Sequence, residues 1–343
     1  MKPLSTNDFG PMAKRTNQRR RTLAALCAGA FAPLTSFAQQ PPTKVWRVGF
    51  LTPGTTPSAV TRMAALRSGL RALGYVEGNN LLIDFRAAEG NRERLPELAV
   101  ELVALKPDVI VTMANYPGEA VKRATSSIPI VMAASVAPVE TGLIASLARP
   151  GGNLTGLTLM SADIAGKWLQ IARELRPGAR RVGVMMLAFM QGKNTLLETL
   201  QLNAQQIKVE LIVPPIKEAA DVPGALAQMR REGAQAVIVQ LNPVNYDQRA
   251  LIVETAAQQK LPAVYENSDF ADLGGLVSYG ANFIDMFRQS ATYIDKIFKG
   301  AKPGDLPMVQ PTTFDFVVNL KTAKALGIKV PGTILLQATR VIE

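Results

Sequence analysis

Polar and aromatic side chains follow several β-rich runs of this sequence at the point where each run ends. Hydroxyl, amide and carboxylate groups in such positions, with a few aromatic rings, could hold a small polar solute. Ligands of open α/β sheets bind outside the carboxyl ends of the strands. The candidate ligand-binding residues, which include one further stacking ring at 279, are Thr52, Thr55, Thr56, Asn115, Tyr116, Ser135, Pro138, Phe189, Asn242, Glu266, Asn267 and Tyr279. Each could be an ordinary turn or cap residue, but together they come from two separate series of strands.

Catalytic chemistry has few possible carriers here. The chain has no His, and its single Cys is Cys27, which excludes Ser-His-Asp and Cys-His machinery and zinc sites built from Cys and His. Glu140, Glu266 and Asp269 could serve acid–base catalysis, but no spacing brings a specific pair together. The run Gly275–Gly280 is out of register for the G-x-S-x-G nucleophile elbow. The sequence therefore predicts no catalytic residue, no metal and no cofactor, and a His-free enzyme is the less favoured alternative.

A glycine pair, Gly151 and Gly152, follows an expected helix and precedes an expected strand. A phosphate-binding loop needs the opposite order, and the chain has no G-x-x-x-x-G-K-S/T motif. With Pro150 before it, the pair is typical of a helix terminator, because proline cannot continue a helix and glycine readily adopts a positive φ.

The first 38 residues have the features of a secretory signal peptide. Arg19–Arg21 form a positive segment, residues 22–34 an uncharged apolar segment, and Ala38 ends a small-x-small site. The apolar segment is too short for a permanent membrane span. We predict cleavage after Ala38 and a soluble periplasmic product, and the sequence leaves open whether export uses the Sec or the twin-arginine route.

The positive charge of the chain belongs largely to this leader. Six of the 38 Lys and Arg residues and one of the 27 Asp and Glu residues fall in residues 1–38, so the formal net charge drops from +11 to +6 on cleavage. Acids are interspersed with the remaining basic residues, as at Arg92–Arg94. This pattern is typical of a solvated surface, and we predict no nucleic-acid partner.

Short apolar runs alternate with amphipathic stretches in two successive series. Strands are expected at 45–51, 81–85, 108–113, 128–132, 181–187, 209–213, 236–241 and 262–265, and helices at 63–74, 95–105, 118–124, 196–206, 222–231 and 246–259. Nearly uninterrupted apolar strands are typical of parallel sheets covered on both faces. The fold class is therefore α/β, with two Rossmann-like parallel-sheet lobes.

The C-terminal tail is too short for a third domain. It contains an expected helix at 284–298, a strand at 314–318 and a helix at 320–326. We expect it to complete both lobes, so that the chain crosses between them more than once. The predicted lobes are 39–158 plus 282–308 and 159–281 plus 309–343.

Five ordered motifs resemble the ABC-transporter substrate-binding family that includes tryptophan-binding and other aromatic-amino-acid-binding proteins. They are WRVGFL at 46–51, LRALGYVEGNN at 70–80, ETGLIASLARPGGNLTG at 140–156, GLVSYG at 275–280 and VNLKTAKALG at 318–327. The resemblance implies a type I periplasmic-binding-protein fold with three crossing strands and a ligand enclosed when the lobes close. It also implies a cleft loop at 135–138, then a helix of the first lobe, then a turn leading to the first crossover near 155–161.

The function that this resemblance implies is uptake of a small solute. The protein would be the periplasmic solute-binding component of an ABC transporter, a monomer that presents its ligand to an inner-membrane ABC permease. A subunit that hands its ligand to a membrane receptor is the alternative, and the sequence does not distinguish the two partners.

Two departures from the family's pattern concern the ligand. Members commonly carry an acidic residue just before the Pro-Val of the cleft loop, where this chain has Ala137, and a Thr-Pro-Ala-type turn where this chain has Asn115, Tyr116 and Pro117. An acid there could pair with a ligand ammonium, and Glu266 of the opposite lobe could substitute for it. An aromatic amino acid, a branched-chain amino acid, an amide and a small carboxylate all remain open.

Overall fold

The computed structural model describes residues 44–188 and 195–343. The predicted signal peptide, its cleavage after Ala38 and the candidate Phe189 lie outside the described residues. Lys44–Glu343 form one compact unit that contains two β-sheets. Within the described ranges, no helix is long and apolar enough to span a bilayer.

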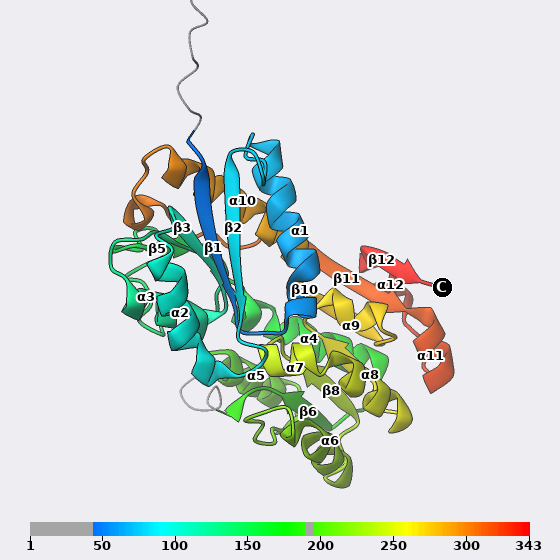
Figure 1. Ribbon diagram of the computed structural model, residues 1–343. Coiled ribbons are helices and arrows are strands. Elements are labelled where there is room, and N and C mark those ends of the chain that lie inside the picture. Colours follow the sequence, from blue (N-terminus) through cyan, green and yellow to red (C-terminus); the bar gives the residue numbers. More distant parts are fainter. Residues whose placement is uncertain (1–43, 189–194) are drawn as a thin grey trace, which may run out of the picture. The chain divides into compact units, whose positions relative to one another are not determined.

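The first sheet has five parallel strands in the order β2-β1-β3-β4-β5 (Figure 1). They are β1 (Trp46–Thr52), β2 (Leu81–Ala87), β3 (Val109–Met113), β4 (Ile130–Ala134) and β5 (Leu154–Gly156). Successive side chains of a strand point to opposite faces, so Val48 and Phe50 enter one hydrophobic cluster while Leu51 enters another.

Four helices cover the two faces of this sheet. They are α1 (Thr56–Ala72) and α10 (Phe283–Phe298) on one face, and α2 (Leu95–Ala104) and α3 (Asn115–Ala124) on the other, with a short 3₁₀ turn η1 (Arg92–Arg94) before α2. The ring of Trp46 stacks on Phe298 of α10 at a centroid distance of 4.1 Å. The C-terminal tail therefore supplies a core helix to the lobe that the N-terminal half builds.

The second sheet has seven strands in the order β12-β11-β10-β9-β8-β6-β7. They are β6 (Arg181–Met185), β7 (Glu210–Ile212), β8 (Ala236–Val239), β9 (Ala263–Tyr265), β10 (Val277–Ala281), β11 (Phe314–Asn319) and β12 (Arg340–Ile342). All neighbours are parallel except β10 and β11. The chain leaves β10 for the first lobe and returns to the same end of the sheet, which makes β11 run in the opposite direction.

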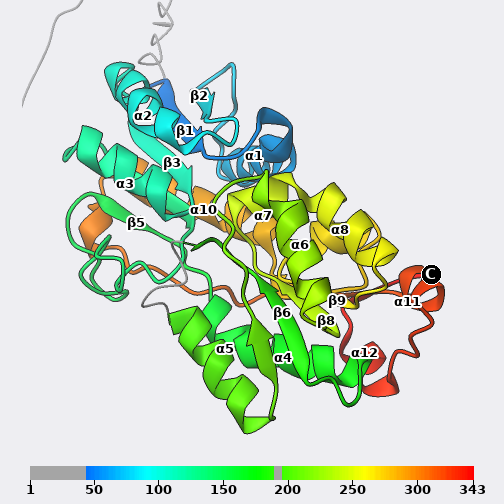
Figure 2. The same cartoon turned by 90° about the horizontal axis from the view of Figure 1, so that it is seen from below.

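Helices also cover both faces of the second sheet (Figure 2). One face carries α4 (Ser161–Leu175), α5 (Thr195–Gln206), α11 (Leu320–Leu326) and α12 (Gly332–Gln337), and the other carries α6 (Asp221–Arg231), α7 (Pro243–Asp247), α8 (Arg249–Gln258) and α9 (Ser268–Asp272). Trp168 of α4 is fully buried at the centre of the first face, and its indole N–H donates to the carbonyl of Tyr279 at 2.7 Å. The predicted α/β class with two sheet-based lobes is confirmed.

The chain passes between the two sheets at three places. Residues 157–160 lead from β5 to α4, residue 282 links β10 to α10, and residues 309–313 lead back to β11. The first and third segments pair through an isolated bridge between Leu157 and Val309. These crossings are the feature that the family resemblance implies.

Two expectations for regular elements are wrong. Residues 139–149 form successive turns and no helix, because Gly142 has a φ of 70° and the backbone N–H groups of Thr141 and Leu143 bond back to Ala137 and Pro138. The helix expected at 246–259 is divided into α7 and α8 at Gln248.

Candidate functional site

A cavity of about 480 Å³ lies between the two sheets. Its wall includes residues at or just beyond the carboxyl ends of strands in both lobes, among them Met113 and Ala134 from the first and Leu187 and Gln240 from the second. This volume is within the range of small-molecule sites. The cavity therefore lies where the strand topology places a ligand.

Several helices begin at the cavity wall. The lining includes Asn115 at the start of α3, Ser161 at the start of α4, Pro243 at the start of α7 and Phe283 at the start of α10. The first turn of a helix has backbone N–H groups without intrahelical partners, so these ends favour hydrogen-bond acceptors on a ligand.

Four of the sequence-predicted site residues line this cavity: Asn115, Tyr116, Pro138 and Asn242. The side chain of Asn242 is committed to the protein, because its Oδ1 accepts the N–H of Asn245 at 2.9 Å and caps α7. Tyr116 lies below the Arg92 guanidinium at 4.9 Å, and burial raises the pKa of its phenol.

Asn115 holds the loop that forms one wall. Its Nδ2 donates to the carbonyl of Val136 at 2.6 Å, and its Oδ1 accepts the N–H of the same residue at 2.9 Å. A further bond runs to Thr141 at 3.3 Å. Asn115 therefore shapes the cavity by fixing residues 136–141, all of which line it.

We expect Asn115→Ala to lower the free energy of unfolding by about 1.5 kcal/mol, because the two backbone groups of Val136 lose their partner. Solute affinity should fall about tenfold, since binding must then order the loop. Denaturant unfolding and titration calorimetry measure both effects. The control is Asn79→Ala, an exposed position with no side-chain hydrogen bond among the described residues; equal effects in the two variants would contradict this role.

Four other predicted residues, at strand ends, do not line the cavity. Thr52 is buried and its hydroxyl accepts the N–H of Gly54 at 3.4 Å. Thr55 is the residue before α1, and Thr56 donates its hydroxyl to Glu89 at 2.5 Å. Ser135 is buried with its hydroxyl bonded to the carbonyl of Leu157 at 3.1 Å. These residues lie at strand ends outside the lining of this cavity.

Two predicted residues of the second lobe are likewise committed within that lobe. The Oδ1 of Asn267 accepts the N–H of Asp269 at 3.1 Å and caps α9. The ring of Tyr279 stacks on Phe314 at 6.0 Å and meets Phe316 edge-on at 5.4 Å, where it packs against the hydrophobic core. Neither residue is in the cavity wall.

Glu266 lies behind the wall and supports it. Its carboxylate is 3% exposed and accepts the hydroxyl of Ser161 at 2.5 Å and the backbone N–H of Leu241 at 2.7 Å. Both partners line the cavity. Burial raises the pKa of Glu266 to about 7, although both hydrogen bonds favour the ionised form. The structure therefore gives Glu266 a supporting position and no direct place in the lining.

Sequence reasoning missed two charged residues of the cavity wall. They are Arg62 of α1, in the first lobe, and Asp247 of α7, in the second lobe. The Arg62 guanidinium is 3.9 Å from the Tyr246 ring centroid, and the side chain is only 4% exposed. A signal was present, because Arg62 precedes Leu66 by four residues and so lies on the apolar stripe of its helix.

A second contact joins the lobes at the rim of the cavity, where the hydroxyl of Thr195 donates to the carboxylate of Glu140. Both residues line the cavity. Together with Arg62 over Tyr246, this bond means that both lobes touch each other at the site.

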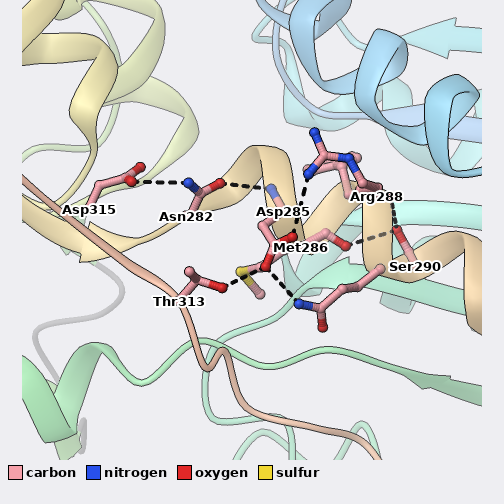
Figure 3. A network of polar contacts seen from close by, with 9 residues as sticks. Asn282, Asp285, Met286, Arg288, Ser290, Thr313 and Asp315 are labelled. Atoms are coloured by element: carbon pink, nitrogen blue, oxygen red, sulfur yellow. Dashed lines mark hydrogen bonds and ion pairs between the residues drawn. The ribbon is translucent and has the colours of Figure 1, made fainter. Parts of the chain in front are cut away.

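The second and third crossing segments are tied together by polar side chains (Figure 3). Asn282 donates to Asp315 of β11 at 3.0 Å and accepts the N–H of Asp285 at 2.8 Å, which caps α10. Thr313 donates its hydroxyl to Asp285 at 2.6 Å. The second and third crossing segments therefore share one hydrogen-bonded network at the start of α10.

We expect Asn282→Asp to keep the helix cap but to replace the bond to Asp315 with repulsion between two carboxylates. Aspartate caps helices as well as asparagine does, so the expected loss of about 1 kcal/mol in unfolding free energy reports the exchange of the Asp315 bond for carboxylate repulsion and not the loss of the cap. Asn91→Asp is the control, because Asn91 caps η1 through the N–H of Glu93 and is exposed. Equal stability of the two variants in urea unfolding would rule the link out.

Comparison with known proteins decides the family. Residues 48–342 match the family model described as ABC transporter substrate binding protein. The chain belongs to this family. A tyrosine-binding protein of Clostridioides difficile is 25% identical to this substrate-binding protein over 257 residues, which are 75% of this chain and 73% of the relative.

Solved structures agree with this assignment. A conserved domain protein from Vibrio cholerae has a TM-score of 0.81 and 27% identity, covering 87% of this chain and 100% of its own. An ABC domain from Streptococcus pneumoniae, solved in complex with L-Trp, has a TM-score of 0.79 and 24% identity. The match covers 87% of this chain and 99% of that domain. Members of the family are extracytoplasmic substrate-binding proteins. In the part of the chain that the structure describes, no group of three or more acidic, Cys or His side chains could hold a metal ion.

Proposed function

We propose that the protein is the periplasmic solute-binding component of an ABC uptake transporter and captures a small organic solute between its two lobes. The observation that carries this proposal is the cavity of about 480 Å³ whose wall both lobes build. The tyrosine-binding and L-Trp-bound relatives support a ligand of that size.

The mechanism is a shift in the population of open and closed forms. A solute that touches both lobes binds the closed form more tightly than the open one, and so stabilises it. The lobes, 39–158 plus 282–308 and 159–281 plus 309–343, would rotate about the three crossing segments. The closed monomer would then be recognised by the inner-membrane permease.

Contacts at the described cavity support this mechanism. Arg62 reaches the ring of Tyr246 in the other lobe, and Glu140 accepts the hydroxyl of Thr195. Both contacts lie in the cavity wall, so a solute placed there would add its own bonds to an existing interface between the lobes.

A thermal-shift screen of the refolded, leaderless chain tests the proposal. Refolding removes solute that copurifies, and the panel contains amino acids, carboxylates, amides and nucleosides. A solute at one hundred times its dissociation constant adds about 2.7 kcal/mol of stability. We expect one compound class to raise the melting temperature, whereas a protein that binds no small molecule would contradict the proposal. N-terminal sequencing of the exported protein should begin at Gln39 if the leader is cleaved after Ala38.

A further inference from the structure

We propose that Arg62 binds a carboxylate of the solute, so that the cavity selects small carboxylic acids with a largely apolar body. This inference rests on the proposed function and names the chemical class of its ligand. It comes from the position of one buried guanidinium in the cavity wall.

Arg62 is the buried one among the charged residues that line the cavity. The described lining contains the charged residues Arg62, Arg92, Glu119, Glu140, Asp163 and Asp247, and the other five are exposed or half-buried. Arg62 forms one hydrogen bond, a long one of 3.4 Å from Nη1 to the carbonyl of Ser58, and no ion pair among the described residues. A buried charge without a counter-ion is costly, so a partner supplied by the ligand is the favoured explanation.

The aromatic neighbours of Arg62 fix its guanidinium. It lies 3.9 Å from the ring centroid of Tyr246 and 5.7 Å from that of Phe283, and both rings line the cavity. A cation–π contact uses none of the N–H groups in a conventional hydrogen bond, so those that do not reach Ser58 remain for a ligand. A carboxylate matches the N–H edge of a guanidinium, because its two oxygens accept two parallel N–H bonds.

The protein's own carboxylates do not neutralise Arg62 by contact. Asp247 and Asp269 are close enough to attract the guanidinium, but neither forms an ion pair with it. Asp269 accepts the hydroxyl of Tyr246 instead, and Arg249 places a second positive charge over that ring at 4.4 Å. Burial lowers the pKa of Arg62, in spite of the attraction of these carboxylates.

The rim carboxylates face other partners. Glu119 pairs with Arg123 at 3.0 Å, and Glu140 accepts the hydroxyl of Thr195. Exposed charges are screened by water and salt far more than buried ones. They therefore oppose an anionic ligand less than Arg62 attracts it.

The rest of the inner wall favours an apolar body with one hydrogen-bond donor. Met113, Val136, Leu159 and Leu187 line the cavity. Asp247 also lines the cavity, and its Oδ1 atom is buried without a hydrogen-bond partner among the described residues, so a donor on the solute that reached this atom would satisfy it. A small acid with an amino or hydroxyl group satisfies both requirements.

Matched pairs of acid and amide test the inference by titration calorimetry at pH 7.5. The pairs are L-leucine with L-leucinamide, L-tyrosine with L-tyrosinamide, and 3-phenylpropionate with 3-phenylpropionamide. We expect the leaderless wild-type protein to bind at least one acid about 100-fold more tightly than its amide, because the amide leaves the buried guanidinium unpaired.

Arg62→Met separates a ligand-binding role from a structural one. We expect it to weaken binding of that acid about 100-fold while the melting temperature of the ligand-free protein stays the same or rises, since an unpaired buried charge is removed. Arg62→Lys should retain part of the affinity, because it keeps the charge but loses the bidentate geometry. The control is Arg71→Met, an exposed arginine on the same helix, which should bind as the wild type does.

Three results would overturn the inference. One is wild-type affinity of Arg62→Met for the acid, another is a large drop in its ligand-free melting temperature, and the third is tighter binding of the amide than of its acid. In each of these cases the protein still binds a small molecule and the proposed function stands. If the wild type binds no compound of the panel, and denatured protein from the periplasm releases no small molecule, the proposed function itself fails.

Discussion

Gly156→Ala is expected to lower the free energy of unfolding by about 4 kcal/mol. Gly156 ends β5 at the first crossing and has a φ of 135°, a backbone conformation that side-chain-bearing residues rarely adopt. A Cβ atom there would lie 2.1 Å from the carbonyl oxygen of Met132 in β4. Backbone strain and overpacking each cost about 1–3 kcal/mol, and here they occur together.

Gly151→Ala is the matched control for this prediction. Gly151 also has a positive φ, 71°, but a Cβ atom there would meet nothing within 4 Å. Only the strain of a positive φ applies, so we expect the free energy of unfolding to fall by about 1 kcal/mol. Urea unfolding of both variants measures the difference, and losses of similar size would show that the close approach of β5 to β4 is not what requires glycine.

Glu266→Gln is expected to remove a pH dependence of stability that the wild type shows between about pH 4.5 and 7. The pKa of Glu266 is raised from 4.5 to about 7 in the folded protein, so the folded state binds a proton more tightly than the unfolded state. The wild type therefore loses stability as the pH rises through this window. The shift corresponds to about 3 kcal/mol by linkage.

Glutamine keeps the shape of the side chain and is neutral at every pH. At pH 8 we expect Glu266→Gln to be more stable than the wild type by about 3 kcal/mol, and at pH 4.5 the two should be alike. Denaturant unfolding at several pH values measures this. Glu254→Gln on α8 is the control, because Glu254 is exposed. If Glu266→Gln showed the same dependence of unfolding free energy on pH as the wild type, Glu266 would not be its source.

The apolar runs of the sequence were enough to predict most strands and both lobes. Val48–Leu51 and Val182–Met185, for example, are nearly continuous hydrophobic segments that become interior strands, each paired on both sides. The C-terminal elements α12 and β12 were not predicted, because they are short and their burial depends on β11 beside them. The helix that the family resemblance implied between the cleft loop and the glycine pair is replaced by turns around Gly142, whose positive φ the resemblance did not reveal.

The candidate site was predicted at the right end of the sheets but with only part of its residues. Asn115 and Asn242 were found because polar residues after strands are visible in the sequence. Thr52 and Ser135 have the same signal but bond to their own backbone surroundings, which only the three-dimensional structure reveals. Arg62 was missed because it lies inside a helix and reaches the cavity through a long side chain.

The central claim is that the two lobes close on a solute. Spin labels on cysteines introduced at Glu97 of α2 and Glu198 of α5, both exposed, would report the distance between the lobes. The labels would be unique, because the chain after residue 38 has no cysteine. The account predicts that the distance shortens and its distribution narrows when the solute identified by the thermal-shift screen is added. Tight binding of that solute with an unchanged distance distribution would contradict it.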